Sequence, residues 1–273
     1  MLSHHLKEAV RIVVVIPMYG KEDYTRKCVS LLKENYGTGK PIEILVVDDG
    51  SETPFVDPTI NVIRLDENSG FTRAANEGIL WAQYRNADAV LLLNNDTEPH
   101  PGFLKELVDA MESDENLGIV GSIRFHPTKP DQPYELVGSD LIRGFQYFVD
   151  EKGLETAPKI LDCNWFPLCS GLLRMDMIRE IGLLDKRFRN HCSDSSYCLW
   201  AKINGWKVAV VPSSVVTHHL SVTTTSNKVD VEKDQKMFLE KIAGIDYAKI
   251  MAHMPLDGES KTWGKIDFMV YTK

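Results

Sequence analysis

The sequence contains little cysteine and no long apolar run. Five cysteines in 273 residues, none of them in a C-x-x-C pair, indicate no disulfide framework, zinc ribbon or thioredoxin-like site. They are expected to stay reduced, as cysteines of cytosolic proteins do. The apolar stretch 12–16 is far shorter than the ~20 residues that cross a bilayer, and nothing before it resembles a signal peptide. We therefore expect a soluble, cytoplasmic protein without a transmembrane segment.

Positive charge is also scarce. The chain has 31 Lys and Arg against 39 Asp and Glu, a net charge of −8. The chain as a whole therefore lacks the excess of positive charge with which proteins bind nucleic acid or an anionic membrane surface. Any anionic ligand must therefore be held locally, with help from a cation. With 43% hydrophobic and 26% charged residues, the composition fits one large or two small globular domains.

Apolar, β-branched runs alternate with amphipathic segments along most of the chain. The runs predict strands buried on both faces, as in a parallel sheet, and the segments predict helices. Prolines and glycines between 127 and 158 indicate hairpins and loops. The predicted strands are 11–16, 41–47, 61–65, 89–93, 117–125 and 207–211, and the predicted helices are 23–34, 72–85, 101–111, 175–182 and 195–204. This order predicts an α/β, Rossmann-like fold with a mostly parallel sheet flanked by helices.

Polar side chains follow several of these strands. Tyr19 follows the first, Asp48 and Asp49 follow the second, and Asn94 and Asp96 follow the apolar run 89–93. The carboxyl ends of parallel strands meet at one edge of the sheet, where α/β proteins bind their ligands. No G-x-G-x-x-G or G-K-[ST] motif is present, so neither a nicotinamide-type nucleotide site nor a P-loop is indicated.

Six segments carry a resemblance to a known family. They are VVVIPMYG, VVDDGS, ENSGFTRAANEGI, LLLNNDTEPHPGFL, SGLLRMDMIREIGLLDKRF and NGWKVAVVPSSVVTHH. In this order and spacing, over roughly residues 11–220, they resemble the GT-A glycosyltransferases of family 2. The resemblance implies an inverting transferase that uses a nucleotide-diphosphate sugar and a divalent metal, Mn²⁺ or Mg²⁺. It does not identify the sugar.

The resemblance implies roles for residues on the nucleotide side. Pro17 and Tyr19 would face the base, Asp49 would accept a hydrogen bond from the uracil N–H, and Asp48 would orient the turn. The alternatives are a turn that serves only its own hydrogen bonds and, for Arg73, a solvated position on the helix. The other donor-binding candidates are Asn68, Gly70, Arg73, Asn76, Asn94 and Asn95.

The predicted metal ligands are Asp96 and His218. Asn94-Asn95-Asp96 stands where the family has its Asp-x-Asp motif, which leaves Asp96 as the single charged ligand. His218 matches the histidine that completes coordination in the family, with His219 as the alternative. A carboxylate and an imidazole favour Mn²⁺ somewhat over Mg²⁺. With one carboxylate, the metal is expected to bind appreciably only when the donor supplies its phosphates.

The predicted catalytic base is Asp194, in the segment HCSDSSYCLW. Inverting sugar transfer needs a carboxylate that takes the proton of the acceptor hydroxyl. Serines 193 and 196 occupy positions where the family often has acids, and Asp194 could also serve as a helix N-cap. Trp165, Ser170 and Gly171 are candidates for the sugar and acceptor pocket, although a core position for Trp165 is an equally simple interpretation.

These predictions divide the chain into a GT-A domain, 1–225, and a small helical C-terminal appendage, 226–273. The nucleotide-sugar half is placed at about 11–125 and the acceptor half at about 126–225. The predicted function is metal-dependent transfer of a hexose or deoxyhexose from a UDP-sugar, or a dTDP-sugar, to a hydroxyl of a glycan or lipid-linked acceptor. Two alternatives are a sugar nucleotidyltransferase and a non-catalytic binding protein. The appendage is expected to dock on its own domain, with subunit pairing or peripheral membrane contact as alternatives.

Overall fold

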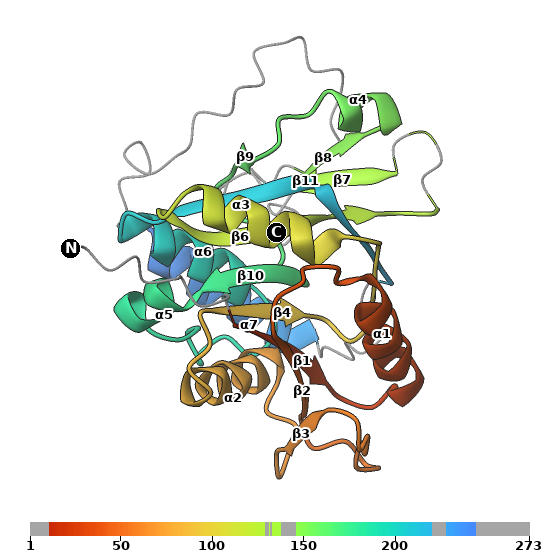
Figure 1. Cartoon of the computed structure of the whole chain (residues 1–273). Helices are drawn as coiled ribbons and strands as arrows, with labels where there is room; N and C mark the ends of the chain where they lie inside the picture. The colour runs from red at the N-terminus through yellow and green to blue at the C-terminus, as the bar shows by residue number, and fades with distance from the viewer. Residues whose placement is uncertain (1–10, 129–130, 132, 138–145, 220–227, 244–273) are drawn as a thin grey trace, which may run out of the picture.

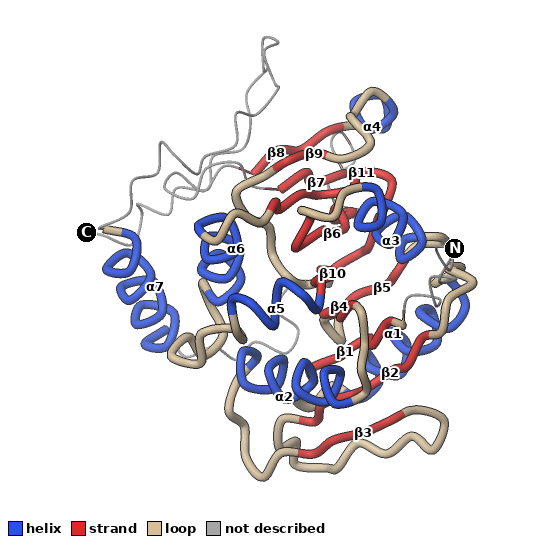
Figure 2. Tube along the Cα trace, turned by 60° about the vertical axis from the view of Figure 1, so that its left-hand side comes forward, coloured by secondary structure: helices blue, strands red, loops and turns tan. Residues whose placement is uncertain are grey.

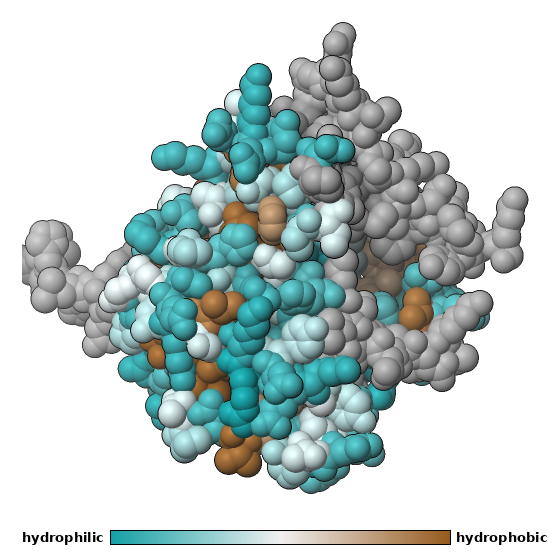
Figure 3. Space-filling view, turned by 90° about the vertical axis from the view of Figure 1, so that its right-hand side faces the viewer, coloured by the Kyte–Doolittle hydropathy of each residue, from teal (hydrophilic) through white to brown (hydrophobic). Residues whose placement is uncertain are grey.

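A computed structural model shows an α/β fold, with helices on both faces of a central sheet (Figure 1). It describes residues 11–128, 131, 133–137, 146–219 and 228–243. Within these ranges no helix is both long and apolar enough to span a membrane. One face of the molecule is mainly hydrophilic, and its apolar residues form small separate patches (Figure 3).

The sheet is mixed. Its main path runs β3-β2-β1-β4-β10-β6-β11-β5; in addition, β7 pairs with β6 and β8, and β9 pairs with β11. Neighbours are parallel from β3 to β4 and between β6 and β11, whereas β10 is antiparallel to both of its neighbours. The strands are β1 (Ile12–Met18), β2 (Ile42–Asp48), β3 (Asn61–Arg64), β4 (Ala89–Leu93), β5 (Thr97–Pro99), β6 (Leu117–Phe125), β7 (Tyr134–Val137), β8 (Gln146–Val149), β9 (Leu161–Asp162), β10 (Ser170–Arg174) and β11 (Lys207–His218).

The helices lie on both faces of the sheet (Figure 2). One face packs against α1 and α3, and the other packs against α2, α5 and α6. The central strands are thus buried on both faces, and all seven residues of β1 are buried. This explains why their sequences are continuous apolar, β-branched runs. The helices are α1 (Glu22–Asn35), α2 (Phe71–Tyr84), α3 (Phe103–Ser113), α4 (Glu151–Glu155), α5 (Met175–Ile181), α6 (Ser193–Ile203) and α7 (Lys228–Ile242).

The N-cap interpretation of Asp194 is wrong, and α1 does not begin at an aspartate cap either. Helix α1 starts after Lys21 and α6 starts after Cys192, and both residues have left-handed backbones, with φ of 51° and 57°. Asp23 and Asp194 lie inside the first turns instead. There they still favour the helix, because a negative charge near the N-terminus interacts with the helix dipole.

The last sheet strand is longer than predicted. Strand β11 continues beyond Val211 through a register shift against β6 and ends at His218. Its final residues pair antiparallel with β5, with His218 opposite Thr97. This pairing brings the end of β11 beside the residues that follow β4.

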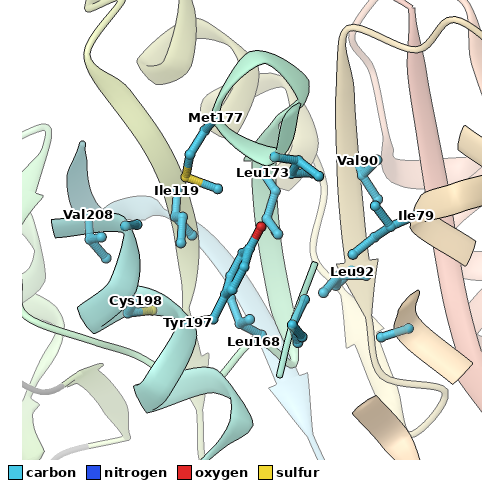
Figure 4. Packing of buried hydrophobic residues seen from close by; sticks show 14 of the residues in the cluster. Ile79, Val90, Leu92, Ile119, Leu168, Leu173, Met177, Tyr197, Cys198 and Val208 are labelled. Atoms are coloured by element: carbon cyan, nitrogen blue, oxygen red, sulfur yellow. The ribbon is translucent and has the colours of Figure 1, made fainter. Parts of the chain in front are cut away.

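The C-terminal helix α7 packs on the same domain, as expected. Phe238 and Ile242 belong to the cluster that also contains residues of α2, β10 and α6, and Lys241 pairs with Asp185 at 3.1 Å. In that cluster Tyr197 of α6 lies near Leu173 and Leu168 (Figure 4). The part of the predicted appendage at 226–227 and 244–273 lies outside the described residues.

Candidate active site

A cleft of about 470 Å³ opens at the carboxyl ends of β1, β2 and β4, beside the end of β11. Its size is that of a site for a small ligand. Further walls come from the start of α2 and from the segment that enters α6. The predicted residues that line it are Pro17, Tyr19, Asp49, Asn68, Gly70, Asn94, Asn95, Asp194 and His218.

Asp48 supports the turn after β2 and does not line the cleft. Its carboxylate accepts hydrogen bonds from the backbone N–H groups of Ser51 at 2.9 Å and Phe55 at 3.1 Å. Arg64 of β3 lies 2.5 Å from the same carboxylate. Burial acts to raise the pKa of Asp48, but these hydrogen bonds outweigh it and hold the pKa below the usual 3.8. The geometry agrees with the predicted turn-orienting role.

Replacing Asp48 by asparagine should lower the free energy of unfolding at pH 7 by about 2 kcal/mol, because the Arg64 contact loses its charge partner. Since the folded pKa lies below the unfolded one, this stabilisation is present above the unfolded pKa and is lost as pH falls through the folded value. Urea unfolding of the two proteins from pH 7 to pH 3 checks this. A difference that stays constant over that range would contradict it.

Asp49 lies at the cleft wall and fixes the loop before α2. Its carboxylate accepts hydrogen bonds from the backbone N–H groups of Ser69 at 2.8 Å and Gly70 at 2.7 Å. Burial raises the pKa of Asp49, against the lowering effect of these two amides. Each carboxylate oxygen still has a second lone pair, so Asp49 can both hold this loop and accept a hydrogen bond from a base.

Gly70 allows this loop to approach the segment before α6. It has φ +91°, and a Cβ built on it would lie 2.6 Å from Cγ and 2.7 Å from the carbonyl oxygen of Arg189. The Arg189 guanidinium donates to the backbone and side-chain oxygens of Asn68, at 2.9 and 2.8 Å. Two walls of the cleft are therefore in direct contact here.

Gly70→Ala should lower the free energy of unfolding by about 2–4 kcal/mol, because it combines an unfavourable φ with a backbone clash. Gly182→Ala is the matched control: its φ is +85°, but nothing lies within 4 Å of an added Cβ. That variant should lose only about 1 kcal/mol. Urea unfolding measures both, and equal losses would contradict the steric account.

Besides Asp48, two more donor-binding candidates do not line the cleft. Arg73 is exposed on α2 and lines a neighbouring pocket; its guanidinium is 3.3 Å from the hydroxyl of Ser69. The amide of buried Asn76 donates to the backbone oxygen of Leu184 at 2.8 Å and accepts from its N–H at 3.0 Å. In both cases the helical periodicity of α2 turns the side chain away from the start of the helix.

Asp96 is 3% exposed and does not line the cleft, but it lies beside His218, which does. The carboxylate oxygen Oδ1 of Asp96 is 3.0 Å from Nε2 of His218, and the amide nitrogen of Asn94 is 3.4 Å from the same ring nitrogen. Burial alone would lower the pKa of His218, but neighbouring Cys169 and the Asp96 carboxylate outweigh it and raise the pKa to about 9. His219 instead points to Glu98, at 2.5 Å. The geometry therefore favours His218 over His219 as the ligand candidate.

With its imidazole deprotonated, His218 offers one ring nitrogen to a cation, beside one carboxylate oxygen of Asp96. Within the described part of the chain, no three His, Cys, Asp or Glu residues gather in a way that would hold a metal. This donor set fits a divalent cation that takes its remaining ligands from phosphate oxygens and water. Asn95 lies next to this pair, but its amide nitrogen donates to the Thr25 hydroxyl at 3.0 Å.

Asp194 is partly exposed at the cleft. Its Oδ1 accepts a hydrogen bond from the N–H of Ser195 at 2.7 Å, which leaves further lone pairs for a substrate proton. Desolvation raises the pKa of Asp194, and the Ser195 amide and His191 act against that rise. A carboxylate with a raised pKa is better matched to accept a proton near neutral pH.

The three residues predicted for the sugar and acceptor pocket lie in the core. Trp165 is 6% exposed and Ser170 is fully buried. The Ser170 hydroxyl is 2.8 Å from that of Ser122, and a Cβ on Gly171 would lie 2.7 Å from Leu168. The antiparallel entry of β10 between β4 and β6 explains this burial, because such a strand is covered on both faces.

Residues that the motifs do not single out complete the cleft. Arg189, Asn190 and His191 line it together with Cys169. The segment 189–191 carries no local sequence signal, since its positions depend on contacts with distant parts of the chain. In the sequence, this segment is marked only by its place between the predicted helices 175–182 and 195–204 and by the neighbouring Asp194.

The mixed α/β sheet, with a cleft of acidic and imidazole groups at its strand ends, agrees with the GT-A fold expected from the sequence. The family model described as glycosyl transferase family 2 matches residues 13–165. The match covers more than half of the chain, and the chain belongs to this family.

Two curated relatives agree with this class. The chain is 27% identical over 161 residues to a glucosyl-dolichyl phosphate glucuronosyltransferase of Haloferax volcanii, covering 52% of the chain and 49% of that protein. It is 25% identical over 237 residues to the O-antigen biosynthesis protein RfbC of Myxococcus xanthus, covering 80% of the chain and 18% of that protein. The chain thus spans half or less of the length of these relatives.

Solved structures share the fold at low identity. The crystal structure of GalNAc-T7 with UDP, GalNAc and Mn²⁺ matches with a TM-score of 0.63 at 16% identity, over 78% of this chain and 44% of that one. Residues 1–349 of S. aureus TarS match with a TM-score of 0.58 at 14% identity, over 87% of this chain and 66% of that one. The matches confirm the predicted fold class.

Proposed function

We propose that this glycosyltransferase moves a hexose or deoxyhexose from a nucleotide-diphosphate sugar to a hydroxyl of a glycan or lipid-linked acceptor, with inversion at the anomeric carbon. UDP-sugars are favoured over dTDP-sugars. The observation that carries the proposal is that Asp49, His218 and Asp194, which come from distant parts of the sequence, line one cleft.

Each part of the cleft has a chemical task in this reaction. Asp49, at the end of β2, would accept a hydrogen bond from the base. Asp96 and His218 would hold a divalent cation, Mn²⁺ or Mg²⁺, which neutralises the departing diphosphate. Asp194 would take the proton of the acceptor hydroxyl as its oxygen attacks the anomeric carbon, opposite the leaving group.

The related proteins support the choice of substrates. One structural neighbour was crystallised with UDP and Mn²⁺, and the names of the curated relatives refer to a dolichyl phosphate-linked sugar and to O-antigen.

We further propose a cytoplasmic location, since the five cysteines are free thiols. For the remaining site candidates, Pro17 and Tyr19 are proposed beside the base, and Asn94 beside the ribose or a metal-bound water.

A panel of UDP- and dTDP-sugars with MnCl₂ tests the proposal. Nucleotide release is measured with and without a mixture of lipid-linked and free glycan acceptors, and NMR of the product gives the anomeric configuration. We expect release from at least one donor, dependent on acceptor and abolished by EDTA. Transfer that retains the donor's configuration would refute the inverting mechanism, and donor binding without turnover against the whole panel would favour a binding protein.

A further inference from the structure

One buried carboxylate on the C-terminal helix contacts a wall of the cleft. Asp234 of α7 is 1% exposed. It accepts hydrogen bonds from three consecutive backbone N–H groups: Arg189 at 3.1 and 3.2 Å, Asn190 at 3.1 Å and His191 at 2.9 Å. Successive amides that converge on one anion form a nest, which fixes the backbone shape of the loop. Helix α7 lies beyond the stretch 13–165 that the family model matches.

The loop 189–191 is joined to the donor side of the cleft. The side-chain oxygen of Asn190 accepts from the N–H of Phe71 at 2.9 Å, and the carbonyl of Arg189 accepts from the N–H of Thr72 at 3.2 Å. These two bonds satisfy N–H groups at the start of α2 that have no partner within the helix, and the Arg189 guanidinium donates in addition to the oxygens of Asn68. The loop 189–191 therefore connects the start of α2 with residues 192–194, which follow the loop in the chain.

That following segment carries the proposed base. Two residues, Cys192 and Ser193, separate His191 from Asp194, and Cys192 has a left-handed backbone with φ of 57°. A non-glycine residue in this conformation is held there by its surroundings. A change in the shape of the loop would therefore move both the start of α2 and Asp194.

We propose that Asp234 is a positioning residue of the active site. Its carboxylate holds the loop 189–191 in the shape that closes the cleft around the nucleotide and aims Asp194 at the acceptor. The part that concerns Asp194 rests on the function proposed above, whereas the closing of the cleft can be measured by nucleotide binding alone. Without the carboxylate, three inward-facing amides would compete for weaker partners or for water.

The helix itself has other anchors, so the effect of Asp234 can be separated from the docking of α7. Phe238 and Ile242 are buried in the domain core. Lys241 donates to the Ser196 hydroxyl at 2.8 Å and pairs with Asp185, and neither contact touches the loop. Removing the Lys241 charge should loosen the same helix at another point and leave the loop in place.

The experiment compares Asp234→Asn with the control Lys241→Met in the full chain. Asparagine keeps the size of the side chain but offers one acceptor oxygen and turns an N–H₂ group toward the amides. Three measurements are made on each protein: hydrogen exchange of the amides of 189–191, affinity for UDP and dTDP in the presence of MnCl₂, and kcat for the donor that the wild type uses. Thermal unfolding reports the shared loss of stability.

For Asp234→Asn we expect loop exchange faster by about ten- to a hundredfold, and nucleotide affinity and kcat lower by about tenfold or more, since hydrogen bonds to a charged group are lost. Lys241→Met should change these three quantities by less than about twofold at a similar loss of thermal stability. Unchanged loop exchange in Asp234→Asn overturns the proposal, and so do equal losses of affinity and kcat in both variants. If wild type binds nucleotide but transfers no sugar, the proposed function fails, and exchange and affinity still decide the role of Asp234.

Discussion

Replacing Asp194 by asparagine should lower the rate of sugar transfer by about 10²–10⁴-fold, the range that a positioned general base contributes. The amide has nearly the same size and can still accept from the N–H of Ser195, so the start of α6 should keep its shape. Only the ability to take a proton is lost. Nucleotide affinity should therefore stay within about twofold of wild type.

The pH dependence of kcat/KM gives a second readout for Asp194. A base works in its deprotonated form, so activity should fall as pH drops through its pKa. Desolvation raises that pKa, which places the acid limb of the wild-type profile above the ordinary carboxylate value of 3.8. The residual activity of the asparagine variant should lack this limb.

Asp176→Asn is the matched control for this prediction. Asp176 is also an acid in the first turn of a helix, but it pairs with Arg179 on the surface at 2.7 Å, with a side chain 74% exposed. A change in helix electrostatics alone would affect both variants alike. Transfer by Asp194→Asn within tenfold of the control would mean that another group acts as the base.

The sheet could be predicted from sequence because its strands are continuous apolar runs. The predicted bounds 89–93 and 117–125 agree with β4 and β6 in full, and their burial on both faces is the physical reason. The short strand β5 was not predicted. It forms because β11 passes beside it. Its three residues, Thr97 to Pro99, are too few to show the alternating pattern of a strand.

The direction of β10 could not be predicted from local pattern. An apolar run has the same composition in a parallel and an antiparallel strand, and only the connection around Leu168 and the neighbours β4 and β6 fix it. The same limit explains the misplaced sugar-pocket candidates. Ser170 was predicted from its residue type, but its hydroxyl lies in a buried chain with Ser122 and Ser214.

The candidate site and the residues that support it divide in the same way. Residues at the ends of strands, such as Asp49 and Asp96, follow from the topology of the sheet once its strands are known. Arg189 and Asp234 do not, because their roles depend on contacts over 121 and 45 positions along the chain. Polar side chains in loops with such distant partners have no spacing that a single sequence could reveal.

If the proposed metal role is right, Asp96→Asn should lower sugar transfer by about a thousandfold, because a bound metal would supply several kcal/mol of charge stabilisation to a departing diphosphate. Asp96 is the only acid of the Asn94-Asn95-Asp96 segment. Its replacement leaves His218 as the sole ionisable group of the pair, and an amide oxygen is a weaker ligand for a hard cation than a carboxylate. Glu98→Gln is the control, since Glu98 lies two positions away and pairs with Lys27 and His219.

Metal binding gives a readout that does not require turnover. Because one carboxylate and one imidazole supply only part of a coordination shell, Mn²⁺ should bind the wild-type chain appreciably only when UDP or dTDP adds its phosphate oxygens. Titration of Mn²⁺ followed by electron paramagnetic resonance, with and without nucleotide, measures this. In Asp96→Asn the nucleotide-dependent binding should be lost, whereas Glu98→Gln should retain it.

Two results would contradict the metal prediction in different ways. Equal Mn²⁺ affinity with and without nucleotide would mean that the protein holds the metal on its own, through ligands other than the Asp96 and His218 pair. Undiminished transfer by Asp96→Asn, or by wild type in EDTA, would mean that protein cations neutralise the diphosphate instead. Arg189 would then be the first residue to test, since it lines the same cleft, and Arg189→Gln should in that case abolish transfer.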